Sequence, residues 1–540
     1  MKAYICLLLS CISFLFAESD SNNQVLIRRL KGLIFYGEND SVKLNGELNF
    51  SGIKTEDVFI PDEQDFMCIM KGFLGKEITE KEIQTIRTKI IDYYKKHNYS
   101  FVVVNMPSGQ NITTGVLRVL VVQGRLGTVK AEGARYFSND KIKEQITTKP
   151  GQIINNCTML NDLMWINSNP YLDTQLIYKP GEKPGYTDVL LKTCDHYPLS
   201  AFGGYENTGN IIGGNSRYFA GANIGNLFSL DHELRYLFVT SSNSNRWYSH
   251  TGAYVYRFRN RQSIELNGAY TIASPSEIDV SSKGRGWRVT GRYIIPYNYN
   301  SLQSDFFVGY EFKRTNNFLS FANTLLFDKK FDISQFVLGY RGKKSFFCGQ
   351  TAFGLTLFLS PGDMTAYNKT SIFELERPGA QSDYVYGEIF LDEYTEFWKG
   401  WAWLLNAKGQ FSTEKLLPLE AFSLGGFYTV RGYDENEVIG DNGVLIKNEL
   451  RARPWKIYRK NCTRLQPLAF VDFGVIADAD KNIISKNSTV LASIGLGIRF
   501  SYATNVIARV DYGYQLHEID RLVDESNSHG RFHVQASLNF

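Results

Sequence analysis

Two kinds of periodicity divide the chain near residue 197. Before that point, apolar residues recur at helical spacing in two regions, and each region is followed by short strand-like runs. After it, apolar and polar residues alternate with a period of two, which is typical of β-strands with one apolar and one polar face. The pattern therefore predicts an α+β region followed by a long all-β region.

The clearest helix of the first region begins after Thr79. Thr79 and Glu82 have the spacing of a capping box. One stripe of the following helix carries apolar side chains, namely Ile83, Ile86, Ile90, Ile91 and Tyr94. Strand-like runs follow over residues 101–104 and 116–122. These elements predict a helix packed against a small sheet.

A similar order of elements recurs after Ser138. Ser138 is placed to cap a short helix, and a second helix follows with Leu160 and Leu163 as its apolar residues. Residues 174–178 and 187–191 then form strand-like runs separated by Pro-Gly turns. Two tandem βααββ units are the simplest interpretation, although many small domains share this order.

The all-β region predicts a membrane barrel. About sixteen alternating runs fit between residues 197 and 540, each long enough for the roughly 9–11 residues of a tilted membrane strand. A soluble β-sandwich would alternate as well. Here the polar faces carry many large charges, which suit a watery lumen, and the other faces carry rings and β-branched residues, which suit lipid. Because lipid does not tolerate open sheet edges, such a sheet has to close.

Composition and the first residues agree with export to the outer membrane. The chain holds 32 Tyr, 37 Phe and 46 Gly, while hydrophobic residues total only 43%, as expected for strands that are apolar on one face. Residues 1–17 are expected to form a cleaved signal peptide, with Lys2 before an apolar stretch and Ala17 at its end. A weak lipoprotein-like Ser10-Cys11 pair is the alternative, but the apolar stretch continues past it.

Charge and metal-binding residue types exclude several functions. A net charge of +4 is too small to indicate a nucleic-acid partner. The histidines are scattered and no CxxC occurs, so no metal site and no other cofactor is expected. Cys157 and Cys194 share one predicted module and form either a disulfide or two free thiols. Neither G-x-S-x-G nor HExxH is present, so an enzyme is not expected.

Several local sequences are more specific. Residues 425–433 read GGFYTVRGY and lie between the eleventh and twelfth predicted strands. Residues 470–474 read FVDFG, an F-x-D-x-G in the thirteenth. Residues 203–209 read GGYENTG at the first barrel strand, and Gly495, Gly497 and Arg499 fall in the fourteenth. With these motifs the chain resembles the TpsB transporters of two-partner secretion, the ShlB/FhaC/HecB or haemolysin-activator family.

The resemblance implies an architecture and a role. Residues 25–124 and 125–196 correspond to a first and a second POTRA domain in the periplasm. Residues 197–540 correspond to an outer-membrane β-barrel. The family exports, and can thereby activate, a large secreted partner that the POTRA domains bind. The barrel is expected to be surrounded by outer-membrane lipid after insertion by the barrel-assembly machinery.

The resemblance also suggests functional residues. Val430, Arg431, Gly432 and Tyr433 match the family's VRGY loop motif, which folds back into the lumen. Phe470, Asp472 and Gly474 match its strand motif, and Phe540, on the lipid face of the last strand, is expected to serve as an assembly signal. A guanidinium inside a barrel needs a carboxylate, so Arg431 and Asp472 are predicted to pair and lock the loop. The alternative is a solvated loop arginine beside an ordinary lumen aspartate.

Two expectations concern how such a transporter works. Residues 116–122 are a candidate exposed sheet edge, to which an extended partner segment would add as a strand. Only residues 18–24 lie between the signal peptide and the first strand-like run, so the plug helix found in many family members is not expected. The first POTRA domain instead has extra material around residues 37–70. A barrel-assembly factor of the same superfamily and a passive porin are the alternative functions.

Overall fold

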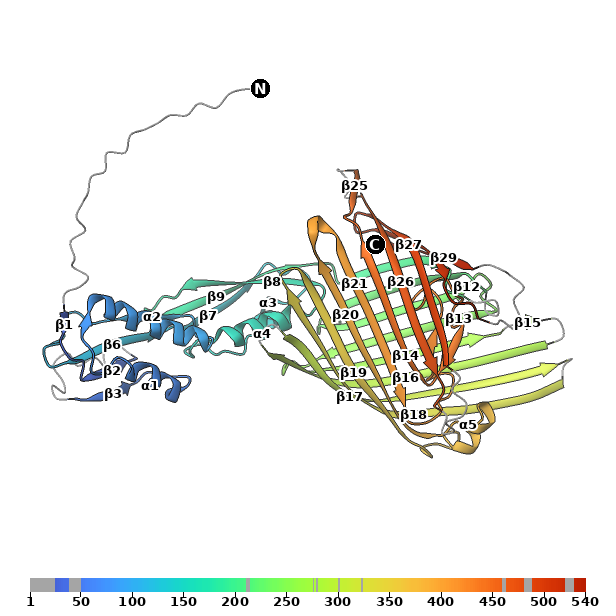
Figure 1. Ribbon diagram of the computed structural model, residues 1–540, viewed down its shortest axis with the longest axis horizontal. Coiled ribbons are helices and arrows are strands. Elements are labelled where there is room, and N and C mark those ends of the chain that lie inside the picture. The colour runs from blue at the N-terminus through green and yellow to red at the C-terminus, as the bar shows by residue number, and fades with distance from the viewer. Residues whose placement is uncertain are drawn as a thin grey trace, which may run out of the picture. The chain divides into compact units, whose positions relative to one another are not determined.

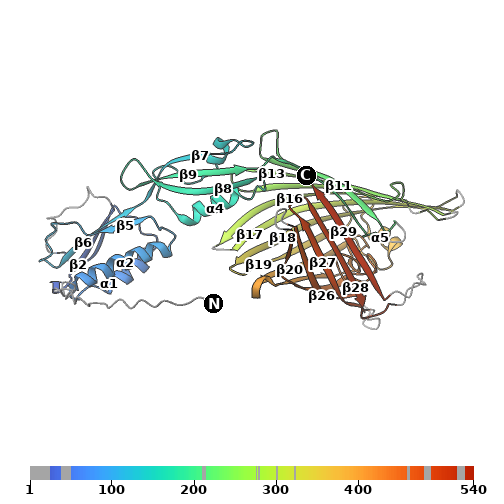
Figure 2. The same ribbon diagram turned by 90° about the horizontal axis from the view of Figure 1, so that it is seen from above.

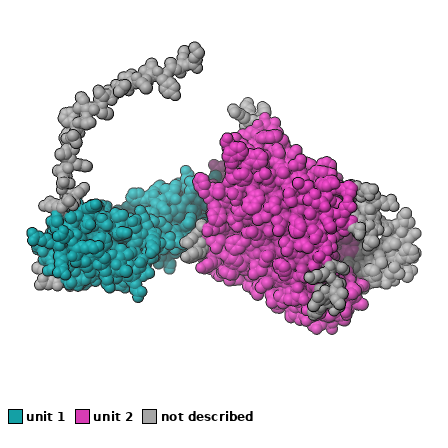
Figure 3. Space-filling view, viewed as in Figure 1, with its two compact units in different colours: residues 1–133, 139–167, 174–194 teal, residues 134–138, 168–173, 195–540 magenta. Residues whose placement is uncertain are grey.

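The chain forms two compact units, which Figure 3 distinguishes by colour. The first comprises residues 1–133, 139–167 and 174–194, and the second comprises residues 134–138, 168–173 and 195–540. The computed structural model describes residues 25–37, 50–209, 214–274, 276–277, 280–299, 302–321, 324–458, 463–479, 488–519 and 529–540. The predicted signal peptide (residues 1–17) and residues 18–24 lie outside these ranges.

The first module of the first unit contains a four-stranded sheet in the order β3-β2-β6-β5. Figure 1 labels β2, β3 and β6 of this sheet. The module's second helix begins as predicted, because the Thr79 hydroxyl accepts a hydrogen bond from the Glu82 backbone N–H (3.4 Å). The predicted stripe faces the core, where Ile86 and Ile90 are fully buried. The elements are β1 (Val25–Ile27), β2 (Gly32–Tyr36), β3 (Gly52–Glu56), α1 (Glu63–Lys71), β4 (Ile78–Thr79), α2 (Glu80–Lys96), β5 (Val102–Asn105) and β6 (Val116–Gln123).

In the described residues, the extra material of this module contains a strand and a helix, β3 and α1. Asp62 caps α1 by accepting a hydrogen bond from the Asp65 backbone N–H (3.1 Å). Phe66 and Met70, one turn apart, are buried in the same core as α2. The capping residue and this spacing were the available signals for α1, but a nine-residue helix offers few positions from which to read a period.

The prediction that residues 116–122 form an exposed edge is wrong. They belong to β6, which pairs in parallel with β2 on one side and antiparallel with β5 on the other. The reason is β2, whose five residues are all buried and which supplies a second neighbour for β6. The edges of this sheet are therefore β3 and β5.

The second module has the predicted βααββ order, with a three-stranded sheet in the order β7-β9-β8. Leu160, expected on the apolar face of its helix, is 51% exposed, and Met159, Asp162 and Ile166 face inward instead. Asp162 tolerates burial because it accepts the Thr147 backbone N–H (2.9 Å). The elements are β7 (Arg125–Glu132), α3 (Asn139–Lys143), α4 (Asn156–Ile166), β8 (Leu172–Pro180) and β9 (Tyr186–Asp195). Cys157 and Cys194 are free thiols.

Sixteen long antiparallel strands close into a barrel in the second unit, which confirms the predicted fold (Figures 1 and 2). The first and last strands complete the ring, with Tyr205 opposite Ala536. In chain order the strands are β10 (Leu199–Glu206), β11 (Arg217–Leu227), β12 (His232–Ser241), β13 (Trp247–Arg257), β14 (Ser263–Ala273), β16 (Val280–Tyr299), β17 (Leu302–Phe321), β18 (Thr324–Phe346), β19 (Gly349–Pro361), β20 (Asp383–Glu396), β21 (Ala402–Ser412), β24 (Asn442–Arg451), β26 (Thr463–Ala477), β27 (Ser488–Tyr502), β28 (Val506–Gln515) and β29 (Gly530–Asn539). Two short strands, β15 (Ser276–Glu277) and β25 (Trp455–Tyr458), extend the hairpins β14–β16 and β24–β26.

The predicted alternation separates an apolar outer face from a polar inner one. On β27 the side chains of Ile494, Leu496 and Ile498 are exposed on the outside, while on β29 His533 is fully buried within the barrel. Such a banded apolar exterior suits lipid. In the part of the chain that the structure describes, no helix is both long and apolar enough to cross a membrane.

The two longest connections between the described strands of the barrel lie at the same end. Residues 347–348 and 503–505 make short turns at the end where β10 begins. Residues 362–382 and 413–441 make long connections at the other end. Short turns are periplasmic and long loops extracellular in outer-membrane barrels. We call residues 362–382, which contain α5 (Thr370–Glu376), the α5 loop, and residues 413–441, which contain β22 (Phe422–Leu424) and β23 (Val438–Gly440), the lumen loop.

The core of the first module should depend strongly on α2. Replacing Ile90 by Ala removes buried methylene groups that pack among the strands β2 and β6. We expect a loss of about 2–5 kcal/mol in the module's stability. Hydrogen exchange of the full-length protein in detergent should show faster exchange of the β6 amides. The exposed neighbour Lys89 supplies the control, since Lys89→Ala should leave the exchange rates unchanged; equal effects of both changes would contradict the assigned core.

Candidate functional site

The lumen loop turns sharply and places its VRGY motif deep inside the barrel. β22 and β23 pair as a small hairpin, and the segment between them contains Gly425, Gly426 and Gly432 with φ of +100°, +106° and +97°. These left-handed conformations favour glycine. Val430 and Arg431 at the tip are fully buried. The motif therefore reaches the barrel interior as the resemblance implies.

Arg431 meets Asp472 in the geometry that the sequence suggested. Arg431 Nε and Nη2 donate to Asp472 Oδ2 and Oδ1 at 2.7 and 2.8 Å, which is a planar, two-point contact. The Arg431 backbone N–H also donates to Asp472 Oδ2 (3.2 Å). Both side chains are 0% exposed. The alternative of a solvated loop arginine is therefore wrong in this structure.

Two further carboxylates complete the surroundings of Arg431. Its Nη1 donates to Glu449 Oε1 (2.6 Å) on β24 and to Asp511 Oδ2 (3.3 Å) on β28. Arg499 on β27 donates to Asp511 in turn, and Arg451 on β24 donates to Glu449 at 2.7 Å. We call Arg431 with its three carboxylates the arginine clamp. It joins the lumen loop to three strands, β24, β26 and β28.

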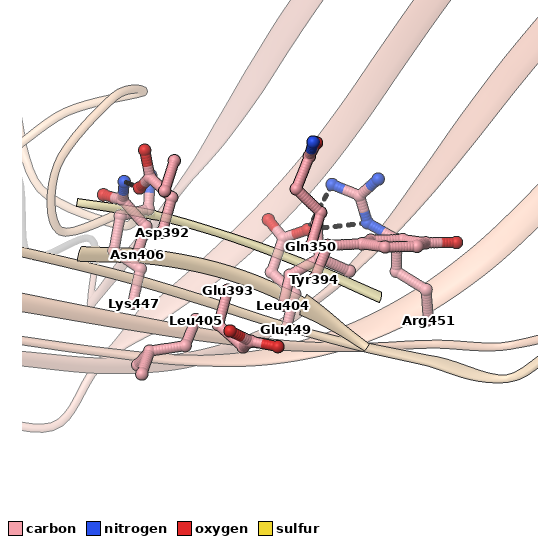
Figure 4. A pocket seen from close by; sticks show the side chains of 11 residues that line it. Gln350, Asp392, Glu393, Tyr394, Leu404, Leu405, Asn406, Lys447, Glu449 and Arg451 are labelled. Carbon is pink, nitrogen blue, oxygen red and sulfur yellow. Dashed lines mark hydrogen bonds and ion pairs between the residues drawn. The ribbon is translucent and has the colours of Figure 1, made fainter. Parts of the chain in front are cut away.

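The wall beside the clamp also contains a charged pocket. Figure 4 shows Glu449 and Arg451 among its lining side chains, with Lys447 from the same strand and Asp392 from β20. Asn406 donates a hydrogen bond to Asp392 on the other side of the pocket (Figure 4). The clamp thus borders a polar, charged part of the lumen.

The other members of the strand motif make room for the clamp. The Phe470 ring lies 3.5 Å from the Arg431 guanidinium carbon, so that a cation–π contact covers the charge. A Cβ at Gly474 would come within 2.6 Å of the Leu424 side chain and 3.2 Å of Val430. In β27, a Cβ at Gly495 would collide with the Phe470 ring, and one at Gly497 would collide with the Asp511 carboxylate. The spaced glycines are explained by these contacts.

Gly432 and Tyr433 fasten the tip to the last strands of the barrel. A Cβ at Gly432 would lie 2.8 Å from the Gly513 carbonyl oxygen, so the two backbones touch. The Gly432 N–H donates to His533 Nε2 (3.0 Å), and Gln515 Nε2 donates to the Gly432 carbonyl (2.6 Å). The Tyr433 hydroxyl donates to the Ala492 carbonyl (2.9 Å). All four residues of the loop motif are thus in contact with the barrel wall or the hairpin.

Not every predicted residue belongs to this site. Phe540 lies on the barrel exterior, 79% exposed, and its backbone exchanges two hydrogen bonds with Ala201 of β10. Conversely, Glu449, Asp511 and His533 belong to the site although no sequence motif marks them. Glu449 and Asp511 stood among charged, inward-facing runs on their strands, and nothing in those runs distinguished them from other lumen residues. In the described part of the chain, no three His, Cys, Asp or Glu residues are grouped so that they could hold a metal ion.

Comparisons with known proteins place this architecture in a family. Residues 185–500 match the haemolysin secretion/activation proteins ShlB/FhaC/HecB, and residues 48–124 match the ShlB-type POTRA domain. The heme/hemopexin transporter protein HuxB of Haemophilus influenzae (strain 86-028NP) is 25% identical over 493 residues, which cover 85% of this chain and 81% of HuxB.

Solved structures share the fold. CdiB from Escherichia coli aligns with a TM-score of 0.79 at 15% identity and covers 98% of this chain and 93% of its own. BamA from Haemophilus ducreyi, lacking its POTRA domains 1–3, aligns with a TM-score of 0.50 at 12% identity, over 96% of this chain and 100% of its own. At these identities the likeness concerns the fold alone.

Removing Arg431 and removing Asp472 should reduce export to different extents. Arg431→Ala removes the two hydrogen bonds that Asp472 accepts from the guanidinium and keeps only the one from the backbone N–H, whereas Asp472→Ala leaves Arg431 with Glu449 and Asp511. An uncompensated buried charge costs about 3–5 kcal/mol. We expect both variants to cripple export, Arg431→Ala more severely, while the double variant is no worse than Arg431→Ala. Arg431→Lys should substitute poorly because an ammonium lacks the planar fork.

Secretion assays, with barrel levels checked by heat-modifiability, measure these effects. The exposed Arg453, just after β24, offers a control, because Arg453→Ala should export normally. Additive losses in the double variant, or full export by either single alanine variant, would contradict the clamp.

Proposed function

Because the chain belongs to the ShlB/FhaC/HecB family of haemolysin secretion/activation proteins, we propose that its periplasmic modules capture an unfolded secreted partner, which the barrel lumen then conducts outward. Members of this family act in the outer membrane as two-partner secretion transporters, and this chain is one of them. The observation that carries the proposal is the clamped lumen loop inside a closed barrel. We assign residues 25–124 and 125–196 as the two POTRA domains and residues 197–540 as the barrel.

Conducting a partner protein through the lumen requires no catalytic group and no cofactor, and we assign none. Folding of the partner outside the cell would make its return unfavourable and so supply a direction. Co-expression with a large secreted protein from a neighbouring gene tests the function, since the partner should reach the medium only when this chain is present. A fall in other outer-membrane barrels without any exported protein would indicate a barrel-assembly factor instead.

The edge strand β5 is the best candidate for partner capture. An exposed strand edge can add a peptide strand through main-chain hydrogen bonds, whatever the peptide's sequence. Charged side chains and bulges protect an edge against such pairing. Two other edge strands have such protection: β3 carries the Lys54–Glu56 ion pair, and β7, at the edge of the second module's sheet, has a register irregularity between Leu126 and Val129. β5 reads Val-Val-Val-Asn, and Val103 is 52% exposed.

A depression beside the beginning of β5 would give the partner further contacts. Phe59 and Tyr99 of the first module form one side, with their rings 5.5 Å apart. Arg125 and Thr147 of the second module contribute to the other side. Aromatic and polar groups of this kind could bind alternate side chains of an added strand.

Partner binding should be sensitive to charge on the β5 edge. Val103→Lys places an ammonium on this edge without disturbing a buried side chain, and we expect partner affinity to fall at least about tenfold, or about 1.4 kcal/mol. Val103→Thr keeps the strand propensity and serves as the control. Binding of the partner's unfolded N-terminal region to the full-length protein can be measured by interferometry. Unchanged affinity of Val103→Lys would exclude β5 as the capture edge.

Phe540 should affect the amount of barrel rather than transport through it. As an exposed aromatic on the outer face of the closing strand, it is available to insertion machinery. We expect Phe540→Ala to lower the barrel level in the outer membrane while export per barrel stays constant. Phe532, 60% exposed on the same face of β29, provides the matched control. A normal barrel level with reduced export would contradict this assignment.

A further inference from the structure

A second buried ionic cluster joins three extracellular loops. Arg377, which directly follows α5, donates through Nη1 and Nη2 to the Asp441 carboxylate at the end of the lumen loop, the Nη2–Oδ2 distance being 3.2 Å. The same Nη2 donates to Asp478 Oδ1 (2.7 Å), just after β26, and Nη1 donates to the Leu416 carbonyl (2.5 Å). One guanidinium thus bridges the α5 loop, the lumen loop and the segment that follows β26.

Asp441 is the centre of this cluster. Its side chain is 0% exposed, and besides Arg377 it accepts the backbone N–H groups of Leu416 (2.9 Å) and Ala479 (2.8 Å). A fully buried carboxylate of this kind requires such partners. Asp478, in contrast, is 41% exposed. The cluster therefore has a dry side at Asp441 and a solvated side at Asp478.

The α5 loop that this cluster holds fills part of the lumen. Phe373 of α5 is fully buried and packs in an apolar cluster with inward-facing residues of the barrel wall, among them Phe331, Ile333 and Tyr386. Leu416 and Leu417 of the lumen loop belong to the same cluster. A polypeptide leaving through the extracellular end would need the space that this cluster occupies.

The α5 loop is fastened differently on its two sides. Toward β18, Asn368 donates to the Asp332 carbonyl (3.0 Å) and Lys329 donates to the Leu375 carbonyl (2.7 Å). Toward the lumen loop, the polar contacts include the Arg377 bonds and a backbone bridge between Ala380 and Lys415, beside the apolar packing described above. Releasing this second side breaks no hydrogen bond between strands of the barrel wall. The side facing β18 could then act as the hinge.

We propose that Arg377, Asp441 and Asp478 form a latch that holds the α5 loop in the lumen of the resting transporter and that opens when the partner is exported. This inference rests on the proposed function, because it assigns the residues that hold the α5 loop in place while the transporter is closed. The arginine clamp keeps the lumen loop attached to the wall, while the latch controls the loop beside it.

Ion current through the purified full-length protein in planar lipid bilayers tests the latch without any partner. Arg377→Ala should raise the open fraction at least about tenfold, and Arg377→Lys should restore closure only in part, because one ammonium cannot reproduce the fork. Glu374→Ala, an exposed change on the same helix, should leave the current at the parent level. In cells, Arg377→Ala should increase sensitivity to vancomycin, which intact outer membranes exclude.

Heat-modifiability distinguishes an open barrel from a misfolded one. Parent-level current through a heat-modifiable Arg377→Ala barrel would overturn the latch, as would an equal rise in Glu374→Ala. If Arg377→Ala does not form a barrel, Asp478→Asn at the solvated side replaces it, and unchanged current there overturns the proposal. Failure of the parent chain to export any partner would contradict the proposed function but would leave the current measurement valid.

Discussion

A loop inside a closed β-barrel has to be held largely through side chains, its own or those of the wall, because the wall strands already use their backbone groups in pairing with each other. Arg431 solves this problem with one guanidinium, which contacts carboxylates on three strands of the wall. Burying that charge is acceptable only because its partners are buried with it. The clamp therefore requires the loop, β24, β26 and β28 to be in register at the same time.

The surrounding residues follow from this requirement. An aromatic ring covers the guanidinium, and glycines stand wherever a Cβ would displace the ring, the carboxylate or the loop backbone. Gly432 and Gly513 allow the loop tip and β28 to touch directly. Sequence motifs that look unrelated, VRGY in a loop and F-x-D-x-G in a strand, are two halves of one packed unit.

The lumen loop is attached to its surroundings by further ion pairs, which differ in how much they are exposed to water. Lys313 of β17 contacts both Glu311 (2.9 Å) and Glu420 (2.5 Å), so the loop's first arm is also tied by charge to the wall. The Arg431–Asp472 pair of the clamp is fully buried, whereas the cluster at Arg377 reaches solvent through Asp478. Attachments with such different access to water can differ in how readily they separate, since water competes for an exposed ion pair but not for a dry one. In the proposed latch, this difference lets the dry attachment keep the lumen loop in place while the solvated one opens.

The alternation of apolar and polar residues was enough to predict the barrel, its strand number and its inward and outward faces, because each strand contacts lipid on one side and water on the other. The helix after Thr79 could be predicted equally well, because its cap and its apolar stripe are formed by residues that are close together in sequence. The Arg431–Asp472 pair could be expected from two motifs together. The central place of β6 could not be predicted, since it depends on pairing with β2, about eighty residues away in sequence. The roles of Glu449, Asp511 and Arg377 likewise depended on the tertiary structure, because a charged residue on an inward face shows its partner only when the barrel has closed around it.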